Sequence, residues 1–97
     1  MTTAEDTRPR LIFFYSPKSG HSRRTEGHIA QVLQAGRNHD TFRRLRISMD
    51  DRPDFAEALQ VDAEPTILVV ENRRVQRRIV CPDGVPAIRE GLAEWLH

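Results

Sequence analysis

The sequence has little sulfur and no long apolar run, and each shortage excludes a class of protein. Cys81 is the only cysteine among 97 residues, so neither an internal disulfide nor a zinc site built on several thiolates can form. The longest apolar runs, residues 11–15 and 67–70, are far shorter than the roughly 20 residues of a membrane-spanning helix. The polar first ten residues lack the apolar core of a secretory signal. We therefore expect one soluble cytoplasmic domain with no membrane partner.

An excess of charge of one sign is also lacking. Lys18 is the single lysine among 15 basic residues, and 14 acidic residues leave a formal net charge of +1. Aromatic side chains, 6% of the chain, are not interleaved with the arginines. Proteins that bind nucleic acids through their backbone usually combine a basic field with stacking aromatics. The composition therefore argues against a nucleic-acid partner.

Apolar periodicity predicts strand, helix, strand, helix, strand, strand and helix, in that order. Residues 1–10 are predicted to be a disordered tail and residues 11–97 one domain. Gly36 is expected to end the first helix, near Ala35, in a left-handed conformation. Asp50 or Asp51 is expected to cap the second helix. The predicted strands are residues 11–15, 40–49, 65–70 and 74–81.

The second half of the chain predicts a hairpin followed by a terminal helix. Residues 71–73 are typical of a tight turn between the third and fourth strands. The terminal helix is marked by apolar residues at helical spacing, namely Ile88, Leu92, Trp95 and Leu96. The class is α/β, with a four-stranded mixed sheet and three helices on its two faces (βαβαββα).

This order, with four short motifs, resembles the thioredoxin family over residues 11–96. The motifs are SGHS at the head of the first helix, MDDRP after the second strand, EPTILVV, and RRIVCPDG before the last helix. The resemblance implies a thioredoxin-like fold with a cis Glu64–Pro65 peptide bond. It also implies that the second and fourth strands are opposite edges of the sheet, so the arginine clusters at 43–46 and 73–78 stay apart.

The departures from the family pattern bear on function. Ser19 and Ser22 stand where the family has its two reactive cysteines, and Phe13 where it has a buried acid. Arg46 matches a lysine that faces that acid and is expected to lose its partner; Lys18 replaces an aromatic residue. Because serine cannot cycle between thiol and disulfide, dithiol exchange is not expected. The serines are either natural or introduced by engineering.

The residues of the degenerate motif have structural and functional interpretations. Ser19 and Ser22 can cap the first helix, or they can form with Gly20 a weak site for an anion or a peptide carbonyl. His21 is expected to be an exposed loop residue. A Ser19–His21 catalytic pair lacks an acid to orient it. The remaining histidines, seven or more residues from His21, offer no metal-ligand spacing, so no metal site is predicted.

In the family, the cis-proline exposes backbone to an extended peptide beside the motif. Here that segment is Glu64, Pro65 and Thr66, and Glu64 gives the groove a negative edge. Alternatively, Pro65 serves only to close the fold. The turn at Cys81 and Pro82 borders the same face. Cys81 is expected to be a buried, inert thiol beside Val75 and Ile79 on one strand face, or else a half-exposed redox thiol.

We expect a redox-inactive thioredoxin-like domain that binds an unidentified protein or peptide across these three segments, without catalytic residues or a cofactor. One alternative is a single-thiol sensor or oxidoreductase that uses Cys81. Another is a glutathione-binding relative, because SPKSGHSRR also resembles the start of a glutathione transferase. Against that alternative, Glu71-Asn72 does not reproduce the acid–serine pair of those enzymes, and their additional helical domain has no counterpart in the sequence.

Overall fold

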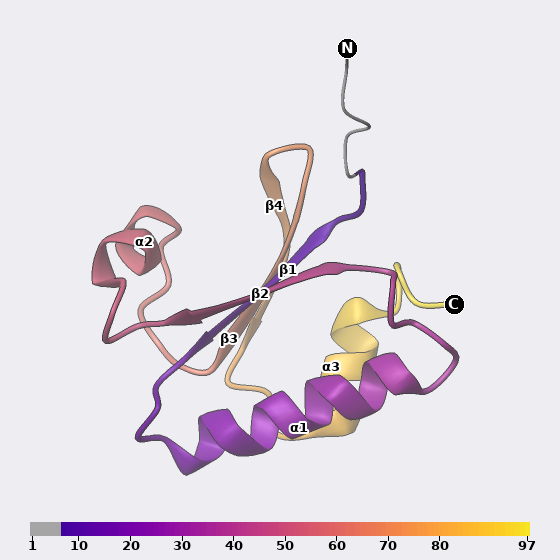
Figure 1. Cartoon of the computed structure of the whole chain (residues 1–97), viewed down its shortest axis with the longest axis horizontal. Helices are drawn as coiled ribbons and strands as arrows, with labels where there is room; N and C mark the ends of the chain where they lie inside the picture. The colour runs from indigo at the N-terminus through magenta and orange to yellow at the C-terminus, as the bar shows by residue number, and fades with distance from the viewer. Residues whose placement is uncertain (1–6) are drawn as a thin grey trace.

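A computed structural model describes residues 7–97, which form a single sheet with helices on both faces (Figure 1). Within the sheet the strand order is β2-β1-β3-β4. β1 pairs with β2 in parallel and with β3 in antiparallel, and β3 pairs with β4 in antiparallel. The mixed four-stranded class is confirmed. The elements are β1 (Arg10–Tyr15), α1 (Gly20–Gln34), β2 (Arg43–Ser48), α2 (Pro53–Ala58), β3 (Thr66–Glu71), β4 (Arg74–Val80) and α3 (Val85–Leu92).

The two central strands are apolar on both faces, as continuous apolar runs predict. One face of β1 and β3 packs against α1 and α3, and the opposite face packs against α2 and the loop after it. Figure 1 shows α1 and α3 side by side below the sheet and the short α2 on the other side. We call these the α1/α3 face and the α2 face. No helix within residues 7–97 is long and apolar enough to cross a membrane.

The ends of α1 are fixed by polar side chains. Ser19 caps its first turn, and Gly36 follows it with a φ of 73°, the left-handed conformation expected there. Buried Asn38 donates to the carbonyl of Ala35 at 3.0 Å and accepts from the backbone N–H of His97 at 2.8 Å. These contacts tie the end of α1 to the C-terminus of the chain.

α2 has no such cap, and the prediction for Asp50 and Asp51 is wrong. The helix begins after Arg52, which makes no side-chain capping bond. The backbone N–H groups of Asp51 and Arg52 instead bond back to the Ser48 carbonyl, which holds the aspartates in the preceding turn. The Arg52 guanidinium bonds to Asp54 at 3.3 Å and holds the pKa of this exposed carboxyl below its usual value.

Several predicted boundaries differ from the structure: β3 is shifted by one residue, to 66–71, and β4 ends at Val80. Arg10, assigned to the tail, is the first residue of β1, while residues 1–6 lie outside the described residues. β2 begins at Arg43, because Thr41 bonds back to Asn38 and holds that stretch in a turn. α3 ends at Leu92, and the predicted helical positions Trp95 and Leu96 pack on the core from beyond it.

A bulge in β4 changes which residues of this strand share a face of the sheet. Val69 lies opposite Arg77 whereas Val70 lies opposite Val75, so one extra residue is inserted in β4. Val75 and Ile79 therefore lie on opposite faces of the sheet, and Cys81 does not share a face with both. The hairpin turn sits at Asn72 and Arg73, whose φ angles of 55° and 64° are those of a two-residue turn matched to strand twist.

Candidate functional site

Three segments distant in sequence meet at one end of the sheet. Ser22 Oγ, in the first turn of α1, donates to a carboxylate oxygen of Glu64. Nε2 of His21, the preceding residue, lies 3.0 Å from the carbonyl oxygen of Pro82. The backbone N–H of Cys81 donates to the Pro65 carbonyl at 2.8 Å. The structure thus brings together the SGHS segment, residues 64–66 and the turn after β4.

Both motif hydroxyls are engaged in holding the fold. Ser19 Oγ accepts from the backbone N–H of Ser22 at 3.0 Å, which satisfies one of the unpaired donors at the start of α1. Ser22 is 2% exposed, and its Oγ accepts from the Ser16 N–H at 3.1 Å while donating to Glu64. Because of these contacts, neither hydroxyl is placed as a nucleophile.

Glu64 has a role that sequence reasoning missed. Its peptide bond to Pro65 is cis. Its half-buried carboxylate faces the start of α1, where it accepts from Ser22. We expected only a negative edge to a groove, yet the carboxylate also joins two segments 42 residues apart. A polar residue next to this proline, where the family has an apolar one, was the available signal.

His21 is not an exposed loop histidine, and it does not pair with Ser19. Its ring is half-buried and bonded to a backbone carbonyl 61 residues away. Because a carbonyl only accepts, Nε2 carries the proton in this contact. His21 therefore positions the turn after β4 and is not oriented as a base toward either serine.

Cys81 is half-buried, so the prediction of a buried thiol is wrong. The strand ends at Val80, and Cys81 turns out of the sheet with a φ of 47°, which prevents it from burying itself as a strand residue would. Its Sγ lies 3.6 Å from the Glu64 carbonyl oxygen. By contrast, Pro65, Thr66 and Pro82 are buried, so the accessible part of this face consists of Ser19, Gly20, His21, Glu64 and Cys81.

Phe13 is the residue that the resemblance matches to a buried acid. Its side chain is buried and stacks on Tyr15 with ring centroids 5.7 Å apart. Arg46 nevertheless has partners, contrary to expectation. Its Nε lies 2.6 Å from Glu26 of α1, and its guanidinium lies 4.5 Å from the centre of the Tyr15 ring. Arg46 is therefore held by a carboxylate of α1 and by an aromatic ring.

The arginine clusters are less separate than predicted. β2 and β4 are opposite edges of the sheet, as expected. However, Arg43 at the start of β2 and Arg73 in the hairpin turn line one hollow together with Arg10. The prediction holds for the rest of each cluster and fails at this end, where β1 and the turn bring the two edges together. No group of three potential metal ligands occurs within residues 7–97.

Comparison with solved structures identifies the fold. The chain is similar to mitochondrial thioredoxin 3 from Saccharomyces cerevisiae, with a TM-score of 0.73, 22% identity, and coverage of 91% of this chain and 79% of that one. It is also similar to a thioredoxin from Halobacterium salinarum, with a TM-score of 0.77 and 15% identity, over 94% of this chain and 77% of that one. A third similar structure is Trxlp from Edwardsiella tarda, with a TM-score of 0.76 and 17% identity, over 87% of this chain and 81% of that one. No family model and no curated protein matches the chain. The chain therefore has the thioredoxin fold.

Proposed function

We propose that the chain is a redox-inactive thioredoxin-like module that binds a protein or peptide segment across Gly20, His21, Glu64 and Cys81. The observation that supports it most directly is the state of the two serines. By the resemblance, Ser19 and Ser22 match the positions of the family's cysteines, and both hydroxyls are used in hydrogen bonds that hold the face together. The module keeps the architecture of the family's site without its chemistry, and it needs no cofactor.

Binding at this face would use backbone and charge. Within residues 7–97, the Glu64 carbonyl has only a long thiol contact from Cys81, so it can accept a hydrogen bond from an extended segment. The Glu64 carboxylate, half-exposed beside it, favours basic or polar side chains at the next position of that segment. The partner we propose is therefore a polar or basic segment of another protein in the cytoplasm.

Gly20 offers a way to block this face without disturbing the fold. A Cβ at Gly20 would meet only the flexible ends of Arg24 and Arg23, at 3.5 and 4.0 Å. Gly27, on the same helix, has nothing within 4 Å of an added Cβ. Gly20→Trp should therefore fill the proposed face, and Gly27→Trp is its matched control.

The test is capture of partners from the native host's lysate on immobilised protein, followed by elution with salt and then with reductant. We expect wild type and Gly27→Trp to retain the same proteins, Gly20→Trp to lose them, and salt alone to release them. Equal retention by Gly20→Trp would place binding elsewhere and refute the proposal. Catalytic reduction of a disulfide-bonded model substrate by the chain would refute redox inactivity.

One observation favours a second function, a single-thiol sensor or oxidoreductase. The Cys81 thiol is half-exposed at the same face instead of buried. A partner that is released only by reductant, and lost in Cys81→Ser, would establish mixed-disulfide chemistry at this thiol. A thiol that fails to react with a thiol reagent in the folded protein would exclude it.

A further inference from the structure

A second surface lies away from the face proposed above, on the half of the sheet that α2 leaves uncovered. The strand register sets its composition, because residues paired across strands share a face. One row crosses the sheet as Arg43, Arg10, Val70 and Val75. The next row is Leu45, Ile12, Leu68 and Arg78. Ile12 and Leu68 are buried, whereas Leu45, Val70 and Val75 stay at least partly accessible next to the arginines. We call this accessible group the open sheet surface.

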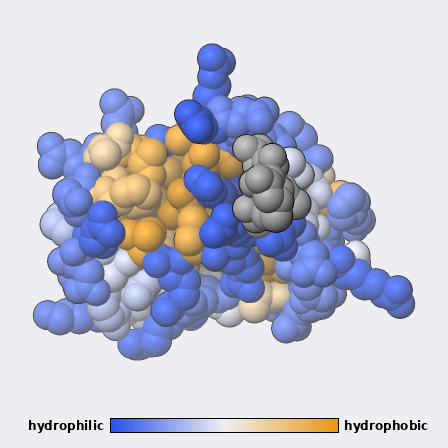
Figure 2. All heavy atoms as spheres, turned by 45° about the horizontal axis from the view of Figure 1, so that its top comes forward, coloured by the Kyte–Doolittle hydropathy of each residue, from blue (hydrophilic) through white to orange (hydrophobic). Residues whose placement is uncertain are grey.

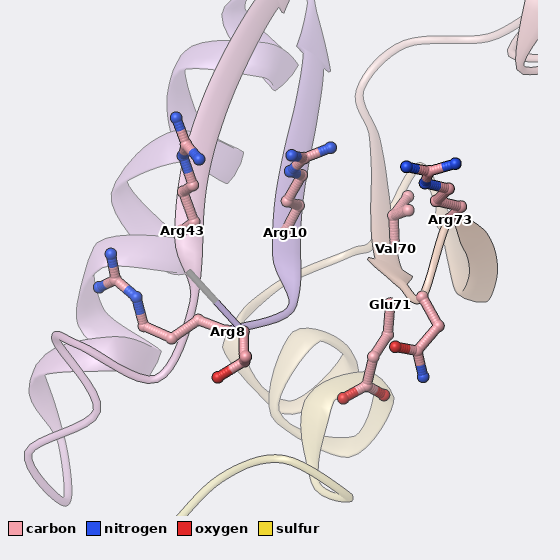
Figure 3. Close-up of a pocket in the computed structure, with 8 residues that line it drawn as sticks. Arg8, Arg10, Arg43, Val70, Glu71 and Arg73 are labelled. Atoms are coloured by element: carbon pink, nitrogen blue, oxygen red, sulfur yellow. The ribbon is translucent and has the colours of Figure 1, made fainter. Parts of the chain in front are cut away.

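The arginines gather around a hollow of about 430 Å³ at that end. Figure 3 shows Arg10, Arg43 and Arg73 extending in one direction, while Glu71 extends in the other. The side chains of these arginines make no hydrogen bond or ion pair with any group in residues 7–97. The Glu71 carboxylate is turned toward Trp95 Nε1, at 3.4 Å, on the α1/α3 face. Like charges on adjacent strands repel, so a bound anionic group would be stabilised here.

Two large apolar side chains of this surface are exposed to solvent. Leu45 is 37% exposed and Val75 is 38% exposed, and both lie on the α2 face. Figure 2 shows a hydrophobic area on this side of the molecule, surrounded by hydrophilic side chains. Contiguous apolar surface with a polar rim is typical of protein interaction sites.

The helices on the two faces of the sheet indicate what kind of partner the open sheet surface can bind. Among residues 7–97, helices of 15 and 8 residues cover the α1/α3 face, whereas the α2 face has a single helix of 6 residues. A sheet face buries its apolar side chains most readily under helices with apolar stripes. The open sheet surface therefore has room for one further helix, and its basic end selects acidic residues at one end of that helix.

We propose that the open sheet surface binds an acidic amphipathic helix of a partner protein, with its carboxylates on Arg10, Arg43 and Arg73 and its apolar stripe on Leu45 and Val75. Guanidinium groups from three different segments can each hold a carboxylate in two-point contact. A free phosphate would use only the arginines, so the exposed side chains of Leu45 and Val75 favour the helix. This surface is separate from the Gly20–Glu64 face, and Gly20→Trp should not affect it.

Three synthetic peptides of about 14 residues, long enough for marginal helicity, provide the probes. The first has glutamates in one end turn and leucines at i, i+3, i+4 and i+7. The second is a scrambled version with the same composition, and the third replaces glutamate with glutamine. We expect the first to bind saturably below roughly 1 mM at low salt, measured by fluorescence anisotropy, and the other two to bind about tenfold more weakly.

Matched variants test the location. Arg10→Gln/Arg43→Gln should weaken the first peptide about tenfold, and Arg23→Gln/Arg24→Gln, with the same charge change on α1, should not. Val75→Ser should weaken it as well. Val80→Ser, at the opposite end of the same strand, is the control for that substitution.

Several results would overturn the proposal. If the scrambled peptide or tripolyphosphate binds as tightly as the first peptide, the surface is an anion site only. Equal weakening by the α1 control variant would mean unspecific charge attraction. Self-association that is abolished by Val75→Ser would assign the surface to a second copy of the chain. Absence of saturable binding of the first peptide would refute the proposal directly, whatever the result at the Gly20–Glu64 face.

Discussion

The two faces of the sheet are built from the same central strands but are finished differently. On the α1/α3 face, Leu11, Phe13, Ile67 and Val69 are all nearly inaccessible beneath two helices. On the α2 face, the central strands are buried but both edges carry exposed apolar residues. The comparison indicates that stability is concentrated on one face, and that the other face is left available for contacts.

The helices differ in the same way. α1 is held at its start by Ser22 and near its end by Asn38, both buried and hydrogen-bonded to distant segments. α2 has no side-chain cap, and its polar contact in the first turn is the exposed Arg52–Asp54 pair. Exposed ion pairs contribute little to stability. We therefore expect local opening of α2 at lower free energy than opening of α1.

The largest test of this comparison is a pair of identical truncations. Leu11→Ala, where the side chain is 1% exposed, should lower the free energy of unfolding by about 3 kcal/mol, because it leaves a cavity under α1. Leu45→Ala, at 37% exposure on the other face, should cost less than about 1 kcal/mol. Urea titrations of both variants measure the difference. Equal losses would show that the α2 face is as tightly packed as the α1/α3 face.

A smaller effect is expected where α1 is tied to the Glu64 loop. Ser22→Ala removes an acceptor from Ser16 N–H and a donor from the Glu64 carboxylate, leaving polar groups in a half-buried setting. We expect a loss of about 2 kcal/mol in unfolding free energy. Ser19→Ala, which removes only the helix cap, should cost about 1 kcal/mol. A Ser22→Ala loss no larger than that of Ser19→Ala would mean that the contact with Glu64 does not stabilise α1.

The same contrast explains how much of the fold the sequence predicted. β1 and β3 were identified because a strand buried on both faces is apolar without interruption, and that signal is local. The aspartate cap of α2 was wrong because backbone bonds to Ser48 decide the turn. The bulge in β4 moved Val75 to the other face, since alternation carries no mark of an inserted residue.

The site divides along the same line. The motifs SGHS, EPTILVV and RRIVCPDG predict the segments of the site, and the structure brings those segments together. The bonds between them were not found, because Ser22–Glu64 and His21–Pro82 join residues 42 and 61 positions apart. The burial of Pro65 and the half-burial of Cys81 likewise depend on where the chain leaves the sheet.

Glycines on α1 and α3 provide a further pair of substitutions. Gly27→Ala meets no atom within 4 Å and should raise the unfolding free energy by about 0.5–1 kcal/mol, the usual gain in a helix. Gly91→Ala would place Cβ 2.5 Å from Ile79 Cδ1 and 2.8 Å from its Cγ1. The forced shift should outweigh the helix gain and cost about 1 kcal/mol. Thermal unfolding measures both variants, and stabilisation by Gly91→Ala would show that α3 is not closely packed on β4.

The smallest expected effect concerns the basic row on the α2 face. Arg43 lies directly opposite Arg10, and like charges in that arrangement are destabilising. Arg43→Glu should therefore raise the unfolding free energy by about 0.5 kcal/mol at low ionic strength. In about 1 M salt the gain should vanish, because the screening length falls to about 3 Å.

Arg44→Glu is the control, because it makes the same charge change at a position opposite the apolar Leu11. It should show no such salt-dependent gain. If Arg43→Glu stabilises the chain but abolishes binding of the acidic peptide, the paired arginines lower the stability of the fold and are needed for binding the peptide. If Arg43→Glu instead destabilises the chain at low salt, the row contributes to the fold, and the two faces differ less than the exposure of their side chains indicates.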